Sequence, residues 1–495
     1  MAEASSRAPL WDWDDLVRVS GGIASGEPTQ PVTGFSIDTR SLQPGDVFVA
    51  LKDQRDGHAF VTAAFERGAA AALVDSTYVR QPGDGALILR RHPLEMLRRI
   101  GIAARSRLKP TARVIAVTGS AGKTGTTAML RAALSTAGKT HAPEKSFNNH
   151  WGVPLTLARM PEDTEFAVFE IGMNHAGEIR PLVKLVRPHI AIVTNVLPVH
   201  VGNFPDGETG VANAKAEIFE GLVDGGVAII PQDNPHFERL SDKASSSGAK
   251  IVSFGRSHPA DVYPKSLRVE PDQSTVELPS GHSYRLRTPG EHIALNSLAV
   301  VAVLQSLAVN WGAKVDMDFG LQTLQFITAT SGRGAQARYL VRAPGSAPPD
   351  EVLLIDESYN ANPASMRAAL AVLGATSPAP GRRRIAVMGD MRELGDLGPQ
   401  LHGDLIDAIA PNKVDAVFAC GPLMQGLFKQ LRADHRGAWS EASTGLIAAL
   451  FDALQPGDVV MIKGSLGTNM APIVNEFKAR DQRLRKEWNA GSGPA

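Results

Sequence analysis

The sequence has little cysteine and no excess of either charge, and each shortage excludes a class of protein. Cys420 is the single cysteine among 495 residues, so no internal disulfide can form, and no Cys/His cluster has zinc-site spacing. The 51 Lys and Arg residues balance 51 Asp and Glu residues, whereas a general nucleic-acid binder carries a basic excess. We therefore expect a cytoplasmic protein that binds no nucleic acid.

Long apolar runs are also missing. The first 16 residues lack the apolar segment that a signal peptide needs, so we expect no secretion. The most apolar stretch, Ala294 to Val309, is shorter than the roughly 20 residues of a membrane span, and polar residues such as Asn296 interrupt it. It predicts a buried core helix and no membrane partner.

Strand-like and helix-like runs alternate along the chain and divide it into three α/β domains. Residues 1–108 combine short β-rich runs around a Pro-Gly-Asp turn with one apolar helical face. Residues 109–331 repeat buried strands and helices, which predicts a parallel sheet, with antiparallel strands between Leu267 and Thr288. Residues 332–495 contain a second strand–helix series, which predicts a Rossmann-like domain whose ligands bind beyond the carboxyl ends of the strands.

The strongest motif is VIAVTGSAGKTGTT, residues 114–127, in which a strand runs into a glycine turn and then a helix. Such a P-loop curls backbone amides around phosphates, while Lys123 can reach the β- and γ-phosphates and Thr124 can hold Mg²⁺. Val117 stands where the first glycine of the common motif would fall, so a chance Gly-Lys-Thr is the alternative. The candidate nucleotide contacts are Gly119, Ser120, Ala121, Gly122, Lys123, Thr124 and Gly125.

A second match to a nucleotide-binding motif lies in the wrong structural context. The tetrapeptide at 412–415, Asn-Lys-Val-Asp, matches the guanine-reading sequence of GTPases, but it precedes its strand and lies in the third domain. We interpret it as a surface turn.

Two polar residues follow central strands, Glu170 after FAVF and His200 after IVTNVLPV. At the carboxyl edge of a parallel sheet they would face the bound phosphates, where Glu170 can ligate Mg²⁺. His200 could equally be a hydrogen-bonded structural residue. Lys215 in AKAEIF is most simply a solvated helix lysine, because an ammonium cannot ligate a metal whereas a carbamate formed with CO₂ can.

Several segments in order resemble the Mur ligase family, the ATP-dependent amide-forming enzymes of peptidoglycan precursor synthesis. The similar segments are TGSAGKTGTT, SFNNHWGVPLTL, FEIGMNHAGEI, TNVLPVHVGNF, AKAEIF, PGEHIALNSLAV and SGRG. DTRSLQPGDVFVAL resembles the N-terminal UDP-binding domain of two later ligases, and DESYNANPASMRAAL with MGDMRELG resembles the last one. The resemblance implies that ATP phosphorylates UDP-N-acetylmuramoyl-tripeptide and that D-alanyl-D-alanine then attacks the acyl phosphate. A monomer is the default expectation for three domains that move around one active site.

The resemblance also implies roles for individual residues. Thr124 and Glu170 would hold one Mg²⁺ ion, and His200 with carbamylated Lys215 a second, with Lys123, His200 and Lys215 as catalytic residues. The remaining implied contacts are Asn296 for adenine, Arg333 for phosphate, Asp356, Glu357, Tyr359 and Asn360 for ribose and phosphates, Thr39 and Arg40 for the uridine diphosphate, Asn148 and Asn149 for the muramoyl-peptide, and Asn360 with Lys463 for the dipeptide. Glu357 stands where the family often has a second aspartate.

Some of these residues could have purely structural roles in place of ligand contacts. Asn296 could cap or pack a helix, and Tyr359 with Asn360 could form an Asx-type turn before Pro363. The competing functions are a paralogous ligase that adds a single amino acid, a folylpolyglutamate synthase, a phosphotransferase, and a nucleotide-binding regulator without catalysis. The UDP-type first domain argues against the folate enzyme, and the intact metal-ligand set argues against a mere binder.

Overall fold

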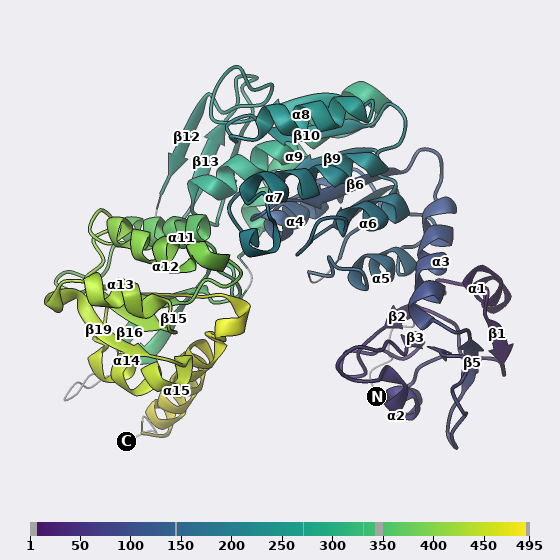
Figure 1. The fold of residues 1–495 in the computed structure, drawn as a ribbon, viewed down its shortest axis with the longest axis horizontal. Helices are drawn as coiled ribbons and strands as arrows, with labels where there is room; N and C mark the ends of the chain where they lie inside the picture. The colour runs from purple at the N-terminus through teal and green to yellow at the C-terminus, as the bar shows by residue number, and fades with distance from the viewer. Residues whose placement is uncertain (1–6, 144–145, 271, 330, 342–349, 492–495) are drawn as a thin grey trace.

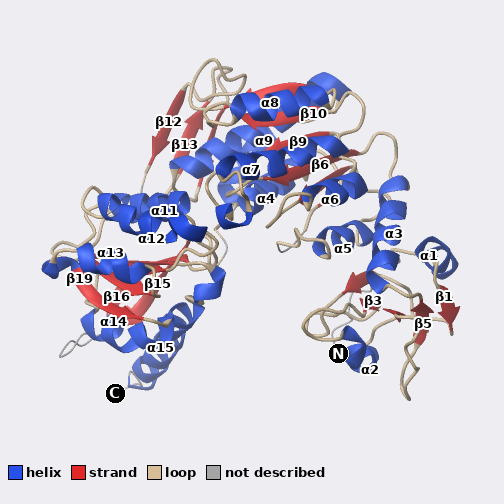
Figure 2. Ribbon diagram, viewed as in Figure 1, coloured by secondary structure: helices blue, strands red, loops and turns tan. Residues whose placement is uncertain are grey.

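The computed structural model describes residues 7–143, 146–270, 272–329, 331–341 and 350–491. Figure 1 shows the N-terminal and C-terminal parts at opposite ends of the molecule, joined by the central part. Figure 2 shows that each part combines helices with its own sheet. The predicted α/β fold class is confirmed.

The first sheet has the strand order β1-β5-β4-β3-β2, in which only β1 is antiparallel to its neighbour. Its strands are β1 (Ile23–Ser25), β2 (Gly34–Ser36), β3 (Asp46–Val49), β4 (Ala71–Val74) and β5 (Ala86–Leu89). The helices of this part are α1 (Trp13–Ser20), α2 (Val61–Glu66) and α3 (Pro93–Ser106). Because β2 to β5 are parallel, their carboxyl ends lie along one edge of the sheet.

The central sheet is parallel, with the order β11-β10-β9-β6-β8-β7. Its strands are β6 (Arg113–Thr118), β7 (Thr140–His141), β8 (Phe166–Glu170), β9 (Ile190–Val193), β10 (Val227–Pro231) and β11 (Lys250–Phe254). Its helices are α4 (Lys123–Leu134), α5 (Gly152–Ala158), α6 (Ile179–Val186), α7 (Glu208–Ala216), α8 (Phe237–Ser246), α9 (Glu291–Trp311) and α10 (Met317–Gln322). The strand order reverses at β6, and such a switch point is where open α/β sheets bind ligands.

The alternating segment after β11 forms a three-stranded antiparallel sheet, as predicted. Its strands are β12 (Ser266–Val269), β13 (Ser274–Glu277) and β14 (Ser283–Leu286). The apolar helix α9 is long enough to cross a membrane by length and composition, yet 67% of its apolar window is buried inside the protein. It is therefore a core helix, as the sequence predicted.

The third sheet has the order β15-β16-β20-β17-β18-β19, and only β15 is antiparallel to its neighbour. Its strands are β15 (Ala335–Val341), β16 (Asp350–Glu357), β17 (Arg384–Gly389), β18 (Ala416–Cys420), β19 (Arg436–Ser440) and β20 (Val459–Lys463). Helices α11 (Pro363–Ala375), α12 (Gly398–Gly403) and α13 (Met424–Gln430) cover one face, and α14 (Ile447–Ala453) with α15 (Ala471–Gly491) cover the other (Figure 1). The edge strands β15 and β19 were not predicted, because AQARYLV and RGAWS mix polar with apolar residues.

One hydrophobic cluster is shared by the first two parts, and each of them also has a separate cluster of its own. One cluster of buried residues runs from Trp11 in the N-terminal part to Ala244 in α8 of the central part. Two polar contacts support this junction: the Trp11 indole donates to the Ala158 carbonyl at 3.1 Å, and the Arg159 guanidinium donates to the Phe35 carbonyl at 2.8 Å. The third part has two clusters of its own, one on each face of its sheet.

Candidate active site

The loop between β6 and α4 is held in a tight curl that only glycine permits at two positions. Gly119 has φ +148°, and a Cβ there would lie 1.9 Å from Thr194 Oγ1. Gly122 has φ +82°, and its Cβ would lie 2.2 Å from the Asn296 amide nitrogen. Lys123 folds back over the loop and donates to the Gly119 carbonyl at 2.8 Å. The curl leaves the first-turn amides of α4 at its end, which makes an anion site.

The end of β9 fixes this loop from the side. The backbone amide of Ser120 donates to the Asn195 carbonyl at 3.0 Å, and the amide of Ala121 donates to the Asn195 side chain at 2.9 Å. The Thr194 hydroxyl donates to the Ala121 carbonyl at 2.6 Å. Thr194 and Asn195 were not predicted as site residues, although two polar residues directly after the buried run IAIV were a usable signal.

Glu170 lies next to the loop and is hydrogen-bonded to three polar side chains. Its side chain is 2% exposed and accepts hydrogen bonds from Thr124 Oγ1 at 2.9 Å, Ser146 Oγ at 2.9 Å and the Asn148 amide at 2.7 Å. Hydroxyl and carboxylate oxygens are the ligands that Mg²⁺ prefers, so this donor set fits the predicted ion. Ser146 was not predicted as a site residue, although it begins the segment SFNNHWGVPLTL.

Arg333 reaches this cluster from the start of the third part. Its guanidinium donates to Thr124 Oγ1 at 2.7 Å and lies 4.1 Å above the centre of the Tyr359 ring. Asp356 fixes the turn that carries it, because its carboxylate accepts from the Gly332 amide at 2.8 Å and the Ser331 hydroxyl at 2.9 Å. Asp356 is 5% exposed, so its carboxylate supports the position of Arg333 in this conformation.

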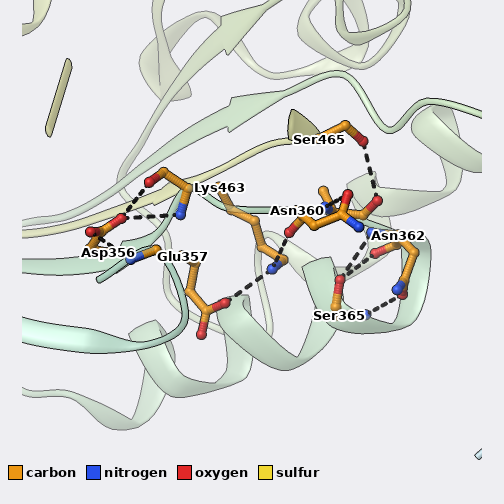
Figure 3. Close-up of polar contacts among 10 residues, drawn as sticks. Asp356, Glu357, Asn360, Asn362, Ser365, Lys463 and Ser465 are labelled. Carbon is orange, nitrogen blue, oxygen red and sulfur yellow. Dashed lines mark hydrogen bonds and ion pairs between the residues drawn. The ribbon is translucent and has the colours of Figure 1, made fainter. Parts of the chain in front are cut away.

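Lys463 lies beneath the segment that the sequence assigned to nucleotide and dipeptide, as Figure 3 shows. Its ammonium donates to the Glu357 carboxylate at 3.1 Å and to the Asn360 carbonyl at 2.9 Å, and the side chain is 3% exposed. The Asn360 side chain accepts from the Ala361 amide at 2.9 Å, which is a local turn contact. Lys463 is thus a support of residues 357–360 in this conformation.

The buried amines shape the electrostatics of the site. Burial lowers the pKa of Lys123, although Glu170 opposes the shift, and burial with the neighbouring charge of Lys123 lowers the pKa of Lys215 well below its ordinary value. Lys215 is 2% exposed, so the interpretation of a solvated helix lysine is wrong, and its side chain forms no hydrogen bond or ion pair with the part of the chain that the structure describes. Burial also lowers the pKa of His200, against Glu393, whose carboxylate contacts the Nδ1 atom of that ring.

The predicted substrate residues lie in two places. Thr39 and Arg40 are in the N-terminal part, where the Thr39 carbonyl accepts from Arg67 at 3.2 Å and exposed Arg40 pairs with Asp38 at 2.7 Å. No hydrogen bond or ion pair within the described ranges joins Thr39 or Arg40 to the loop at Lys123. Asn148 lies beside Glu170, whereas the Asn149 side chain accepts from the Gly152 amide at 2.9 Å at the start of α5.

Family comparisons agree with this geometry. The model of the Mur ligase middle domain matches residues 117–304, and that of the Mur ligase glutamate ligase domain matches residues 345–466. The chain belongs to the Mur ligase family, whose members are ATP-dependent ligases that form peptide bonds.

Individual ligases and solved structures are similar to this chain over nearly its whole length. The UDP-N-acetylmuramoyl-tripeptide–D-alanyl-D-alanine ligase of Bacillus subtilis (strain 168) is 33% identical, with 93% of this chain and 96% of that protein covered. The enzyme of the same name from Escherichia coli (strain K12) is 34% identical, with coverages of 89% and 92%. A crystal structure of MurF from Acinetobacter baumannii is 30% identical, covers 95% of this chain and 99% of that chain, and superimposes with a TM-score of 0.79.

Proposed function

We propose that this protein joins D-alanyl-D-alanine to UDP-N-acetylmuramoyl-tripeptide. ATP transfers its γ-phosphoryl group to the terminal carboxylate of the tripeptide, which gives an acyl phosphate and ADP. The dipeptide amine then attacks the acyl carbon and loses a proton, and inorganic phosphate leaves as the amide bond forms. Support comes from relatives of this activity that match nearly the whole chain, and from the site at Lys123.

The residues around the phosphate loop stabilise charge on the transferred group. The α4 amides and Lys123 would bind the β- and γ-phosphates, and Arg333 would approach the phosphoryl group from the third domain. Thr124 and Glu170 would hold a Mg²⁺ ion. When bound, Mg²⁺ neutralises phosphate charge and polarises the phosphoryl oxygens.

A second Mg²⁺ ion would be held by His200 and by the carbamate of Lys215. The neutral amine is the form of lysine that reacts with CO₂, and the low pKa of Lys215 keeps that form available. The Lys215 side chain forms no ion pair within the described part of the chain, so the carbamate would not have to break one.

The three domains would divide the substrates. Residues 1–108 would bind the uridine diphosphate through Thr39 and Arg40, with Asn148 and Asn149 on the path of the muramoyl-peptide. Residues 109–331 would bind ATP, with Asn296 near adenine. Residues 332–495 would bind the dipeptide with Asn360 and Lys463, and would close over ATP with the segment 356–360, so that rotation of one domain completes the site. We place the enzyme in the cytoplasm as a monomer without a membrane or nucleic-acid partner.

One observation carries this proposal: Arg333 and Thr124, which lie 209 residues apart in the sequence, are hydrogen-bonded beside Glu170 at the phosphate loop. The test is phosphate release from ATP with Mg²⁺, bicarbonate and UDP-N-acetylmuramoyl-tripeptide. D-alanyl-D-alanine, single amino acids and no acceptor are compared, and the product is weighed by mass spectrometry. We expect turnover only with the dipeptide.

Matched variants sharpen this test. Lys123→Met should lower kcat by about 10²-fold or more, because it removes a charge that stabilises the transferred phosphoryl group. Lys184→Met, at an exposed position of α6, should leave kcat unchanged. Turnover with a single amino acid alone would make the chain a paralogous ligase, and ATP binding without turnover would make it a binding protein.

A further inference from the structure

A loop of the third domain touches the central domain beside His200. This loop, residues 389–395, follows β17 and meets the short helix Val201–Asn203. The Gly202 amide donates to the Glu393 carbonyl at 3.4 Å, and a Cβ on Gly202 would lie only 3.0 Å from the Gly395 nitrogen. The two backbones are therefore in direct contact, with no space for side chains between them.

The two side chains that meet at this contact both project from left-handed backbone. His200 has φ +57° and Glu393 has φ +66°, which non-glycine residues adopt rarely and only where the surroundings fix them. The Glu393 carboxylate contacts Nδ1 of the His200 ring. Both residues therefore adopt a rare backbone conformation at the point where their side chains meet, which indicates that the surrounding structure fixes this contact.

Buried hydrogen bonds hold the Glu393 loop rigid. The Met391 amide donates to Nε2 of His402, which is fully buried, at 2.8 Å. The Arg392 amide donates to the Ser465 hydroxyl at 2.9 Å, and the Ser465 amide donates to the Asp390 carbonyl at 3.0 Å. The backbone that carries Glu393 is thus attached to the third domain, so the carboxylate moves with that domain.

We propose that Glu393 is a positioning residue for His200. Its carboxylate lies against Nδ1, which occupies that nitrogen and leaves Nε2 as the nitrogen that can bind a metal. Because Glu393 belongs to the third domain, His200 is oriented only when that domain is docked. This inference rests on the proposed function through the assignment of His200 as a metal ligand.

The test measures metal binding and domain position, both without turnover. Mn²⁺ is titrated into wild type and Glu393→Gln with a non-hydrolysable ATP analogue and bicarbonate, and free Mn²⁺ is read by electron paramagnetic resonance. Partners of metal-bound histidines typically change metal affinity 10- to 100-fold, so we expect one class of Mn²⁺ site to weaken by at least about 10-fold. Asp396→Asn, an exposed carboxylate of the next turn, is the matched control and should bind Mn²⁺ as wild type does.

Two further measurements separate positioning from a general structural effect. In a His200→Ala background, Glu393→Gln should weaken Mn²⁺ binding no further, because the imidazole that it orients is gone. Nitroxides on the exposed sites Ser247→Cys and Ala433→Cys should report a broader interdomain distance in Glu393→Gln, while buried Cys420 stays unlabelled.

Equal Mn²⁺ affinity and equal distance distributions in Glu393→Gln and wild type would overturn the inference. So would an additive loss in the His200→Ala background. Failure of dipeptide-dependent turnover in wild type would instead refute the proposed function alone, since neither readout depends on the acceptor.

Discussion

Replacing Lys215 by Met should stabilise the central domain at neutral pH while removing the carbamate site. Lys215 is 2% exposed and has no partner in the described part of the chain, and burial lowers its pKa well below the ordinary value. Deprotonating an ordinary lysine at pH 7.5 costs about 4 kcal/mol, and burying this amine in its uncharged form includes that cost. Lys215→Met should therefore raise the free energy of unfolding by up to about 4 kcal/mol in CO₂-free buffer.

The lowered pKa of Lys215 also determines how the stability of the protein depends on pH. Between the lowered value in the folded chain and the ordinary value near 10.4 in the unfolded chain, the unfolded state binds one more proton. Wild-type stability should therefore rise with pH in this window, by up to about 1.4 kcal/mol per unit. Lys215→Met should lack this rise, so the advantage of the variant should shrink as the pH approaches 10.

Hydrogen exchange of the β6 and β9 amides measures this free energy for the central domain, which avoids treating three domains as one unfolding unit. ¹³C-labelled bicarbonate supplies the second readout: a carbamate signal should form on wild type and not on Lys215→Met. A variant that is less stable than wild type at every pH would refute the reasoning, because it would mean that Lys215 is charged and paired in the native protein.

Three further predictions concern other parts of the site. Arg333→Ala should lower kcat by about 10³-fold with little change in ATP affinity, while exposed Arg338→Ala should not; equal kcat values in steady-state assays would refute the transition-state role. Gly122→Ala should weaken ATP binding at least about 10-fold by calorimetry, because φ is +82° and the new Cβ meets the Asn296 amide at 2.2 Å. The Gly122→Ala reasoning is wrong if ATP binds as tightly as to wild type. Asn149→Ala should remove the side-chain acceptor of the Trp151 and Gly152 amides at the entry to α5 and cost about 1 kcal/mol, seen as faster hydrogen exchange at the start of that helix; unchanged protection would show that these amides have another acceptor.

Features that depend on local sequence were predictable. The strand, glycine turn and helix at residues 114–127 are adjacent in the chain, so their geometry follows from the periodicity and the glycine positions. Glu170 was predictable for a related reason, since it directly follows a buried strand and parallel strands end at one edge of a sheet. The five central strands β6, β8, β9, β10 and β11 all lie in predicted apolar runs, and the two-residue strand β7 was too short to leave a pattern.

Contacts between distant segments were not predictable in the same way. Ser146 reaches Glu170 from another loop, and Glu393 reaches His200 from another domain, so no spacing in the sequence links either pair. Lys463 was recognised as the end of a strand, but the direction of its side chain depends on Glu357 in the neighbouring strand. A single sequence shows which chemistry is available at a strand end and leaves the choice of partner to tertiary packing.

The shared core of the first two parts also affects how the chain folds during synthesis. The buried cluster that contains Trp11 and Phe35 also contains Ala244, so almost half of the chain must leave the ribosome before that cluster can close. The third part closes both of its clusters with residues after 340. Domains normally fold as units from the N-terminus onward. Here the cluster between Leu42 and Leu87 can close within the N-terminal part itself, whereas the N-terminal residues of the shared cluster stay exposed until residue 244 has left the ribosome.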